Sequence, residues 1–154
     1  MPKIDIDTLA ERHGSSYPEP FARCAEQRTR KALGDAAGLT DFGVNLLQLP
    51  PGAWSSQRHW HSHEEEFVYV LSGELVLISD QGEQLLCAGD AAAFPRNCPD
   101  GHHLVNRSSA LAVCLEVGSR SSNDAVVYPD IDLRWDAQHD YTHHDGRPYP
   151  PSTG

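Results

Sequence analysis

The 154-residue sequence predicts a single all-β domain of jelly-roll type, and two observations carry this prediction. Only 39% of the residues are hydrophobic, and eleven prolines and twelve glycines interrupt the chain, so its core must come from short strands joined by many turns. Between residues 41 and 118, short apolar or alternating runs recur at regular spacing with turn residues between them. This spacing is typical of a β-sandwich or a small jelly-roll barrel.

The segment before the barrel, residues 1–40, is polar and mixed, and we expect it to form an arm. In its sequence RTRKALGDAAGLT (residues 28–40), hydrophobic periodicity does not decide between an edge strand and a short helix. The N-terminus MPKIDIDTLAERHG lacks the apolar stretch of a signal peptide, and no run approaches the ~18 apolar residues of a membrane span. We therefore expect a cytoplasmic protein without membrane contacts.

The barrel itself, residues 41–118, is predicted to contain about eight strands, because turn sequences such as PPG, SGE, DQGE and AGD divide the apolar runs. The expected strands cover residues 42–49, 54–61, 67–71, 75–79, 84–87, 91–94, 102–106 and 110–118. After Gly118 the chain is polar and rich in proline. We expect residues 119–154 to form an arm that wraps the barrel and ends in a loose tail.

The charge of the chain restricts its partners. The formal net charge is −10, from 12 Lys and Arg residues against 22 Asp and Glu residues. A surface of this sign repels the phosphate backbone of nucleic acids and anionic membranes. We therefore expect a small-molecule ligand and no nucleic acid.

The four cysteines are scattered and form no C-x-x-C pair, so the sequence encodes neither a zinc knuckle nor a redox dithiol. Free thiols are the simpler expectation. Cys114 lies in the apolar run LAVCLEV and is predicted to fill the core. Cys98, in the loop NCPDG, is the one cysteine placed for a chemical role.

The stretch HWHSHEEEFVYVLSG (residues 59–73) concentrates histidines and glutamates directly before an apolar run. Residues two apart on a strand face the same side, so His59 and His61 project together. Glu66 opens the next strand and can reach the same point, and His102 begins a strand that would lie nearby in the barrel. Three imidazoles and one carboxylate suit Fe, Mn, Ni, Zn or Cu rather than Ca. A register in which His63 replaces His61 leaves only two residues before Glu66 and stays an alternative.

These residues resemble the two motifs of the cupin superfamily, G-x5-H-x-H-x3,4-E-x6-G and G-x5-P-x-G-x2-H-x3-N. The matching residues are Gly52, His59, His61, Glu66 and Gly73 for the first motif, and Gly89, Pro95, His102 and Asn106 for the second. The chain has one extra residue after Gly52, and in PRNCPDGH the glycine comes late, so the loop before His102 is one residue longer. More narrowly, the chain is similar to small bacterial single-domain cupins often labelled sugar-phosphate-isomerase-like or mannose-6-phosphate-isomerase-like.

The resemblance implies a jelly-roll barrel with a divalent transition metal, and three classes of function. The first is a metal-dependent enzyme that acts on a small polar metabolite by isomerase, lyase or dioxygenase chemistry. The second is a non-catalytic cupin that binds or senses a small molecule, and in the third the metal only supports the fold. Fold analogy cannot choose among these reactions.

Candidate acid–base and anchoring residues are His63 and Glu64 at the mouth of the barrel, and Arg96 for an anionic group of the ligand. The acidic pair Glu64 and Glu65 is expected in a turn at the entrance. There it is either simply solvated or repels anionic ligands, unless Arg58 or Arg96 offsets it.

The remaining histidines have simpler expected roles. His103 should face opposite to His102, at the surface or in an interface. Asn106 should stabilise the turn that follows it. His143 and His144 lie in THHDGRPY, where we expect a hydrated loop, with a second metal site as the alternative.

Alternation also predicts an exposed apolar face. If Glu66 points into the barrel, Phe67, Tyr69 and Leu71 point outward, and Trp60 is expected on the same face. Exposed aromatics at that density usually mark an interface. We therefore expect a homodimer packed sheet to sheet.

Overall fold

The computed structural model describes residues 3–150, which contain thirteen β-strands in three sheets and little helix. The strands are β1 (Arg12–His13), β2 (Thr29–Ala32), β3 (Phe42–Leu49), β4 (Trp60–His61), β5 (Glu66–Ser72), β6 (Glu74–Ser79), β7 (Gly82–Cys87), β8 (Ala91–Phe94), β9 (His103–Val105), β10 (Ala112–Ser119), β11 (Ala125–Tyr128), β12 (Leu133–Asp136) and β13 (Asp140–Thr142). The helices are α1 (Leu33–Ala36) and two short 3-10 helices (Ile6–Thr8 and Phe21–Ala25). The all-β prediction is confirmed, and eight strands, β3 to β10, occupy the predicted barrel region.

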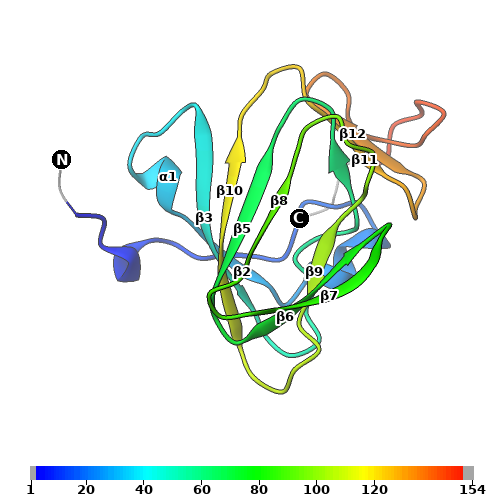
Figure 1. Cartoon of the computed structure of the whole chain (residues 1–154). Helices are drawn as coiled ribbons and strands as arrows, with labels where there is room; N and C mark the ends of the chain where they lie inside the picture. The colour runs from blue at the N-terminus through cyan, green and yellow to red at the C-terminus, as the bar shows by residue number, and fades with distance from the viewer. Residues whose placement is uncertain (1–2, 151–154) are drawn as a thin grey trace.

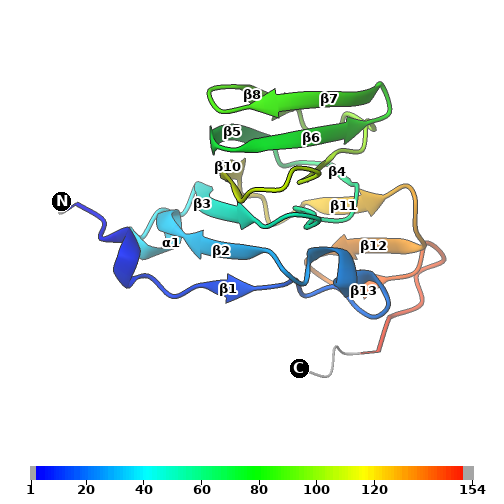
Figure 2. The same cartoon turned by 90° about the horizontal axis from the view of Figure 1, so that it is seen from below.

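The largest sheet has six strands in the order β1-β2-β3-β10-β5-β8, and Figure 1 shows β3, β10, β5 and β8 side by side. A second sheet has the order β7-β6-β9, and a third has the order β13-β12-β11-β4. Viewed from below, the strands of the large sheet are stacked on one side and those of the other two sheets beside them (Figure 2). The fold therefore has two β-layers, as expected of a jelly roll.

The main core lies between the six-stranded and the three-stranded sheets. Its buried side chains come from β3, β5 and β10 on one side and from β6, β7 and β9 on the other. They include Leu47, Leu49, Val68, Val70, Leu75, Leu77, Leu86, Leu104 and Cys114. Cys114 is fully buried, which confirms its predicted place in the core. Because the apolar residues fill one end of the space between the layers, the other end is left for polar groups.

Residues 28–40, where periodicity left two possibilities, contain both a strand and a short helix. Strand β2 pairs antiparallel with β3 and so extends the large sheet beyond the barrel strands. Helix α1 follows at once and contacts β3. Its Gly34 packs so tightly that a Cβ atom there would lie 2.9 Å from the backbone nitrogen of Val44.

Residues 119–150 add the strands β11, β12 and β13, and β4 joins them through pairing with β11. A second apolar cluster connects these strands to the N-terminal segment, with Tyr17 packed edge-on against Tyr128 at 5.6 Å between ring centroids. The expected tail ends at residues 151–154, which lie outside the described residues, as do residues 1 and 2. No helix among residues 3–150 has the length and apolar character needed to span a bilayer.

Asn106 stabilises the turn after β9, as predicted. Its side-chain oxygen accepts hydrogen bonds from the backbone nitrogen and the hydroxyl of Ser108, at 2.9 and 2.8 Å. Its amide nitrogen donates to the carbonyl oxygens of Leu49 and Ala110, both at 2.7 Å. These hydrogen bonds satisfy both polar atoms of the Asn106 side chain, which is completely buried.

Two predictions from alternation were wrong. His103 is only 5% exposed, because Trp54 packs edge-on against its ring and Nδ1 lies 3.0 Å from the carbonyl oxygen of Ser56. Trp60 does not share the outer face of β5, because its strand pairs with β11 instead, and its half-buried side chain lines a cavity together with His61.

Candidate metal centre

Backbone pairing brings His59 and His102 together although 42 residues of sequence separate them. Each donates its backbone N–H to the carbonyl oxygen of the other, at 3.1 and 2.9 Å, which forms an isolated antiparallel bridge. His61 lies two residues further along, on β4, and Glu66 is the first residue of β5. Three separate segments of the chain therefore position the four predicted ligands.

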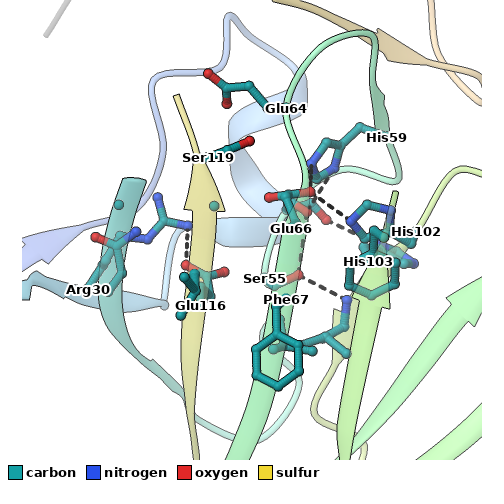
Figure 3. A pocket seen from close by; sticks show the side chains of 18 of the residues that line it. Arg30, Ser55, His59, Glu64, Glu66, Phe67, His102, His103, Glu116 and Ser119 are labelled. Atoms are coloured by element: carbon teal, nitrogen blue, oxygen red, sulfur yellow. Dashed lines mark hydrogen bonds and ion pairs between the residues drawn. The ribbon is translucent and has the colours of Figure 1, made fainter. Parts of the chain in front are cut away.

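The imidazole rings of the three histidines converge on one carboxylate oxygen of Glu66. The Nε2 atoms of His59, His61 and His102 lie 3.4, 3.3 and 2.9 Å from Oε2 of Glu66. Figure 3 shows His59 and His102 directed toward Glu66, with dashed lines between them. The predicted register is thus the one in which His61, and not His63, reaches the cluster.

Two of the three imidazoles are held by hydrogen bonds at their far nitrogen. Nδ1 of His59 lies 2.8 Å from the carbonyl oxygen of Gln57, and Nδ1 of His61 lies 2.7 Å from Oδ2 of Asp124. Since these oxygens only accept, both Nδ1 atoms must donate, which leaves Nε2 as the nitrogen that can bind a metal. Partners of this kind are typical of histidines that bind metals.

His102 is held by packing instead. Its ring stacks flat on Phe94, with 3.5 Å between centroids and 1° between the planes. Its Nδ1 is buried and has no hydrogen-bonding partner among residues 3–150. Burial lowers the pKa of His102, more than the hydrogen bond to Glu66 raises it, so this ring is neutral at physiological pH.

Asp124 lies outside both cupin motifs and organises the whole turn between β4 and β5. Its side chain is 1% exposed. Besides bonding His61, its Oδ1 accepts the backbone N–H groups of His63 and Glu64, at 2.8 and 3.2 Å, and the hydroxyl of Ser62 at 3.3 Å. A carboxylate with this many donors is stabilised in its charged form, and the pKa of Asp124 is lowered although burial acts in the opposite direction.

Charges within the cluster are strongly coupled. Burial alone would lower the pKa of His61, but the bonds to Asp124 and Glu66 outweigh it and raise that pKa to about 10. Burial would raise the pKa of Glu66, but the three imidazoles hold it well below the ordinary value. In the metal-free protein a proton on His61 therefore partly balances the two carboxylates beside it.

The residues present fit a divalent transition metal. His59, His61 and Glu66 each offer one ligand atom, and these atoms all lie within 4.8 Å of one another. His102 is not part of that closest group, although its Nε2 reaches Glu66. The mixed imidazole and carboxylate donor set is the one that Fe, Mn, Ni, Zn and Cu accept.

A second group with the same spacing consists of His61, Glu64 and Asp124. It shares His61 with the first group, and Asp124 is already committed to the hydrogen bonds of the turn. Neither group of the described part of the chain includes His143 or His144. Nδ1 of His143 lies 2.8 Å from Asp132, and Nε2 of His144 lies 3.0 Å from the carbonyl oxygen of Leu133.

Of the three candidate acid–base and anchoring residues, only Glu64 lies beside the cluster. Glu64 lines the cavities beside the cluster, and burial raises its pKa. Its Oε1 accepts the backbone N–H of Ser121 at 2.8 Å. By contrast, His63 is exposed and Arg96 is 65% exposed, and neither lines those cavities.

The charges at the entrance are partly offset. Glu65 is 60% exposed and lies 3.9 Å from Nε of Arg96, a distance typical of a weak surface ion pair. Arg58 does not offset the acidic pair, because it binds Asp130 at 2.7 Å and also Asp80.

A cavity of about 230 Å³ opens beside the cluster. Its walls include Glu66, His59 and His102 on one side, and Arg30 and Glu116 on the other (Figure 3). A second cavity of about 360 Å³ is lined by Trp60, His61, Glu66 and the strand β8. The candidate metal centre thus borders two spaces that can receive a small molecule.

Comparison with known proteins agrees with this geometry. A family model described as the cupin domain matches residues 45–118. A solved structure from Silicibacter pomeroyi DSS-3, described as a sugar phosphate isomerase from a cupin superfamily, is 45% identical, covers 97% of both chains and has a TM-score of 0.91. The chain belongs to the cupin superfamily.

Two further solved structures are more distant. A structure from Acidithiobacillus ferrooxidans ATCC 23270, described as a putative sugar phosphate isomerase, is 36% identical, covers 75% of this chain and 74% of its own, and has a TM-score of 0.70. The polyketide cyclase RemF of Streptomyces resistomycificus is 23% identical, covers 77% and 79%, and has a TM-score of 0.61, which shows a shared fold alone. No curated protein matches this cupin.

Sequence reasoning missed three residues of the site, namely Arg30, Glu116 and Asp124. Each comes from outside the two motifs, and none belongs to a local pattern with the histidines. Glu116 had one usable indication, since it is a charged residue inside the otherwise apolar run LAVCLEVG. A charge in such a run is often functional, because its burial must be compensated.

Proposed function

We propose that this cupin binds a divalent transition metal through His59, His61, Glu66 and His102 and isomerises a small hydroxycarbonyl compound. One observation carries the proposal: three imidazole nitrogens meet at one oxygen of Glu66, on the wall of a cavity. The similarity to two solved structures, one described as a sugar phosphate isomerase and the other as a putative one, supports the choice of reaction. A metal bound there would polarise a carbonyl or hydroxyl group of the ligand.

Within this proposal, Glu64 is the proton-transferring residue. It faces the same cavity as Glu66, and its raised pKa brings it closer to the range in which a carboxylate is an effective base. Its bond from Ser121 holds one carboxylate oxygen, so that the other remains available. In isomerisation of a hydroxycarbonyl compound, the carboxylate would take the proton from the hydroxyl-bearing carbon beside the carbonyl and return it to the former carbonyl carbon, while the hydroxyl proton moves to the former carbonyl oxygen.

The test is an exchange experiment in D2O. The metal-loaded protein is incubated with small hydroxyaldehydes and hydroxyketones, and NMR follows deuterium at the carbon beside the carbonyl. We expect incorporation with the wild type, a decrease of about 10²-fold or more with Glu64→Gln, and no change with His63→Gln, whose side chain is exposed. Compounds that bind without exchange or conversion would instead support a non-catalytic binding cupin.

We also propose that this cupin forms a homodimer through the outer face of β5. Phe67, Tyr69 and Leu71 are 39–45% exposed in a row on that strand, while the residues between them are buried. A second copy of the chain presents the same row and can cover it by symmetry.

A further inference from the structure

The large sheet carries polar side chains on the face that lines the cavity. Glu116 of β10 pairs with Asn45 of β3 and with Val68 of β5, and paired residues face the same side. Val68 is buried in the core, so all three point between the layers. Glu66 lies two residues before Val68 and therefore shares this face.

Arg30 reaches the same wall from β2, outside the segment that matches the cupin model. It pairs with Leu47, which is fully buried, and so also faces inward. Its Nη2 lies 2.9 Å from Oε2 of Glu116, across the intervening strand β3 (Figure 3). Arg30 and Glu116 therefore form an ion pair opposite the candidate metal centre.

The side chains of Arg30 and Glu116 line the cavity and are 31% and 20% exposed, so the pair still has hydrogen-bonding capacity there. Nε of Arg30 is buried, and no acceptor lies within reach of it among residues 3–150. Glu116 keeps further lone pairs, since a carboxylate can accept about four hydrogen bonds. A further cavity of about 230 Å³, lined by Ser15, Tyr17 and Arg28, meets the first one at Arg30 and Glu116. Ser15 Oγ is likewise buried without a partner in the described part of the chain.

The two arginines that line the first cavity are already paired with carboxylates. Arg30 is neutralised by Glu116, and Arg120 at the cavity mouth is paired with Asp35. Arg28 lines the neighbouring cavity; it keeps its charge, but it is buried and donates Nε to the carbonyl oxygen of Gly14 at 2.8 Å and Nη1 to that of Ser55. A phosphate group entering here would meet Glu116 without a free arginine, whereas a hydroxyl group can donate to Glu116 and accept from Arg30.

We propose that Arg30 and Glu116 together bind hydroxyl groups of a small, neutral polyhydroxy compound and select against its phosphorylated form. This inference rests on the proposed function, because the same compound would present its carbonyl end to the metal centre. Both cavities at this wall are smaller than the ~300–1,000 Å³ of drug-sized ligand sites, which suits a compound of monosaccharide size or smaller. The arginine and the carboxylate act as one donor and acceptor unit.

The experiment compares D-mannose and D-fructose with their 6-phosphate esters, by calorimetric titration or ligand-observed NMR at millimolar concentration on the metal-loaded protein. The wild type should bind at least one hexose roughly tenfold or more tightly than its ester, because an unpaired anion beside Glu116 is unfavourable. Glu116→Gln should weaken hexose binding about tenfold and strengthen ester binding, since it frees the charge of Arg30. Arg30→Met should weaken binding of the hexose.

Glu83→Gln is the matched control. Glu83 forms a comparable ion pair with Arg107 at 2.6 Å, but that pair is exposed and away from the cavity, so both affinities should stay unchanged. Tighter binding of the esters by the wild type, no binding of either hexose, or equal behaviour of Glu116→Gln and Glu83→Gln would overturn the inference. Metal content is measured in parallel: wild-type protein without metal would refute the proposed function, whereas normal metal content with unaltered sugar selectivity refutes only the role of the pair.

Discussion

Asp124 and His61 lie 2.7 Å apart, from carboxylate Oδ2 to imidazole Nδ1, although 62 residues separate them in the sequence. The bond directs Nε2 of His61 toward Glu66, and the same carboxylate holds the backbone of the turn that leads to β5. A residue just before β11, outside the cupin motifs, thus orients a ligand inside them.

Replacing Asp124 by Asn should therefore weaken metal binding while the four candidate ligands remain in place. We expect a loss of roughly 10- to 100-fold in metal affinity, the usual effect of removing the partner of a metal-bound histidine. The measurement is a competition titration with a chelator. Asp132→Asn is the control, because Asp132 holds His143 through a similar 2.8 Å bond outside the site; equal affinities of the two variants would contradict this role of Asp124.

Gly73, which ends the first motif, is required for packing as well as for its turn. Its φ is +75°, and a Cβ atom there would lie 2.8 Å from the carbonyl oxygen of Leu111 and 2.9 Å from Cα of Ala112. Gly38 has nearly the same φ, +73°, but open space around it. Gly38→Ala should cost about 1–2 kcal/mol of unfolding free energy from backbone strain alone, and Gly73→Ala clearly more. Denaturant unfolding measures both, and equal losses would show that the contact with Leu111 is unimportant.

The alternating patterns of single strands could be predicted from the sequence, whereas the pairing of strands far apart could not. Period-two alternation correctly placed Glu66, Val68 and Val70 on the inner face of β5, since this needs only the local pleat. Trp60 was misplaced because its neighbour is β11, about 65 residues later, and not β5. No local sequence pattern indicates that β4 pairs with β11.

The same limit applies to the site. Motif spacing brought together His59, His61, Glu66 and His102, because family motifs record which distant residues meet. Asp124 lies outside the motifs, and its role depends on one tertiary contact, so no spacing rule could identify it. His103 was expected at the surface because alternation describes faces of a strand but not what covers them, and here Trp54 covers the ring.

Stability should fall in alkaline solution because of buried Tyr17. Burial is the main cause that raises its pKa from the ordinary value of about 10 to about 12, and Tyr141 adds to it. The folded protein thus holds the phenolic proton more tightly than the unfolded chain. Its contribution is complete below pH 10 and is lost as the pH rises from 10 to about 12, roughly 3 kcal/mol in all.

Chemical denaturation across this pH range tests the effect. The unfolding free energy of the wild type should decrease between pH 10 and 12, and Tyr17→Phe should flatten that decrease. Parallel curves for the two proteins would rule out Tyr17 as the titrating group.

The proposed homodimer predicts a mass of two chains in light scattering at micromolar concentration. Leu71→Arg should shift this mass toward one chain, because it places a charge in the apolar row on β5. Leu85→Arg, on the exposed side of β7 and 58% exposed before substitution, should leave the mass unchanged. A wild-type monomer would exclude the dimer, and dissociation by both variants would show that the row on β5 is not specific.

The metal content of protein purified without an affinity tag tests the central claim most directly. Elemental analysis of the wild type should find about one Fe, Mn, Ni, Zn or Cu ion per chain, as four converging N and O donors imply. His61→Ala and His102→Ala should each lower this content far below one ion per chain, whereas His144→Ala should retain it, because His144 belongs to neither candidate metal group and its ring lies against Leu133 and Asp132. Full metal content in the His102→Ala protein, or a metal-free wild type after incubation with these ions, would contradict the assignment.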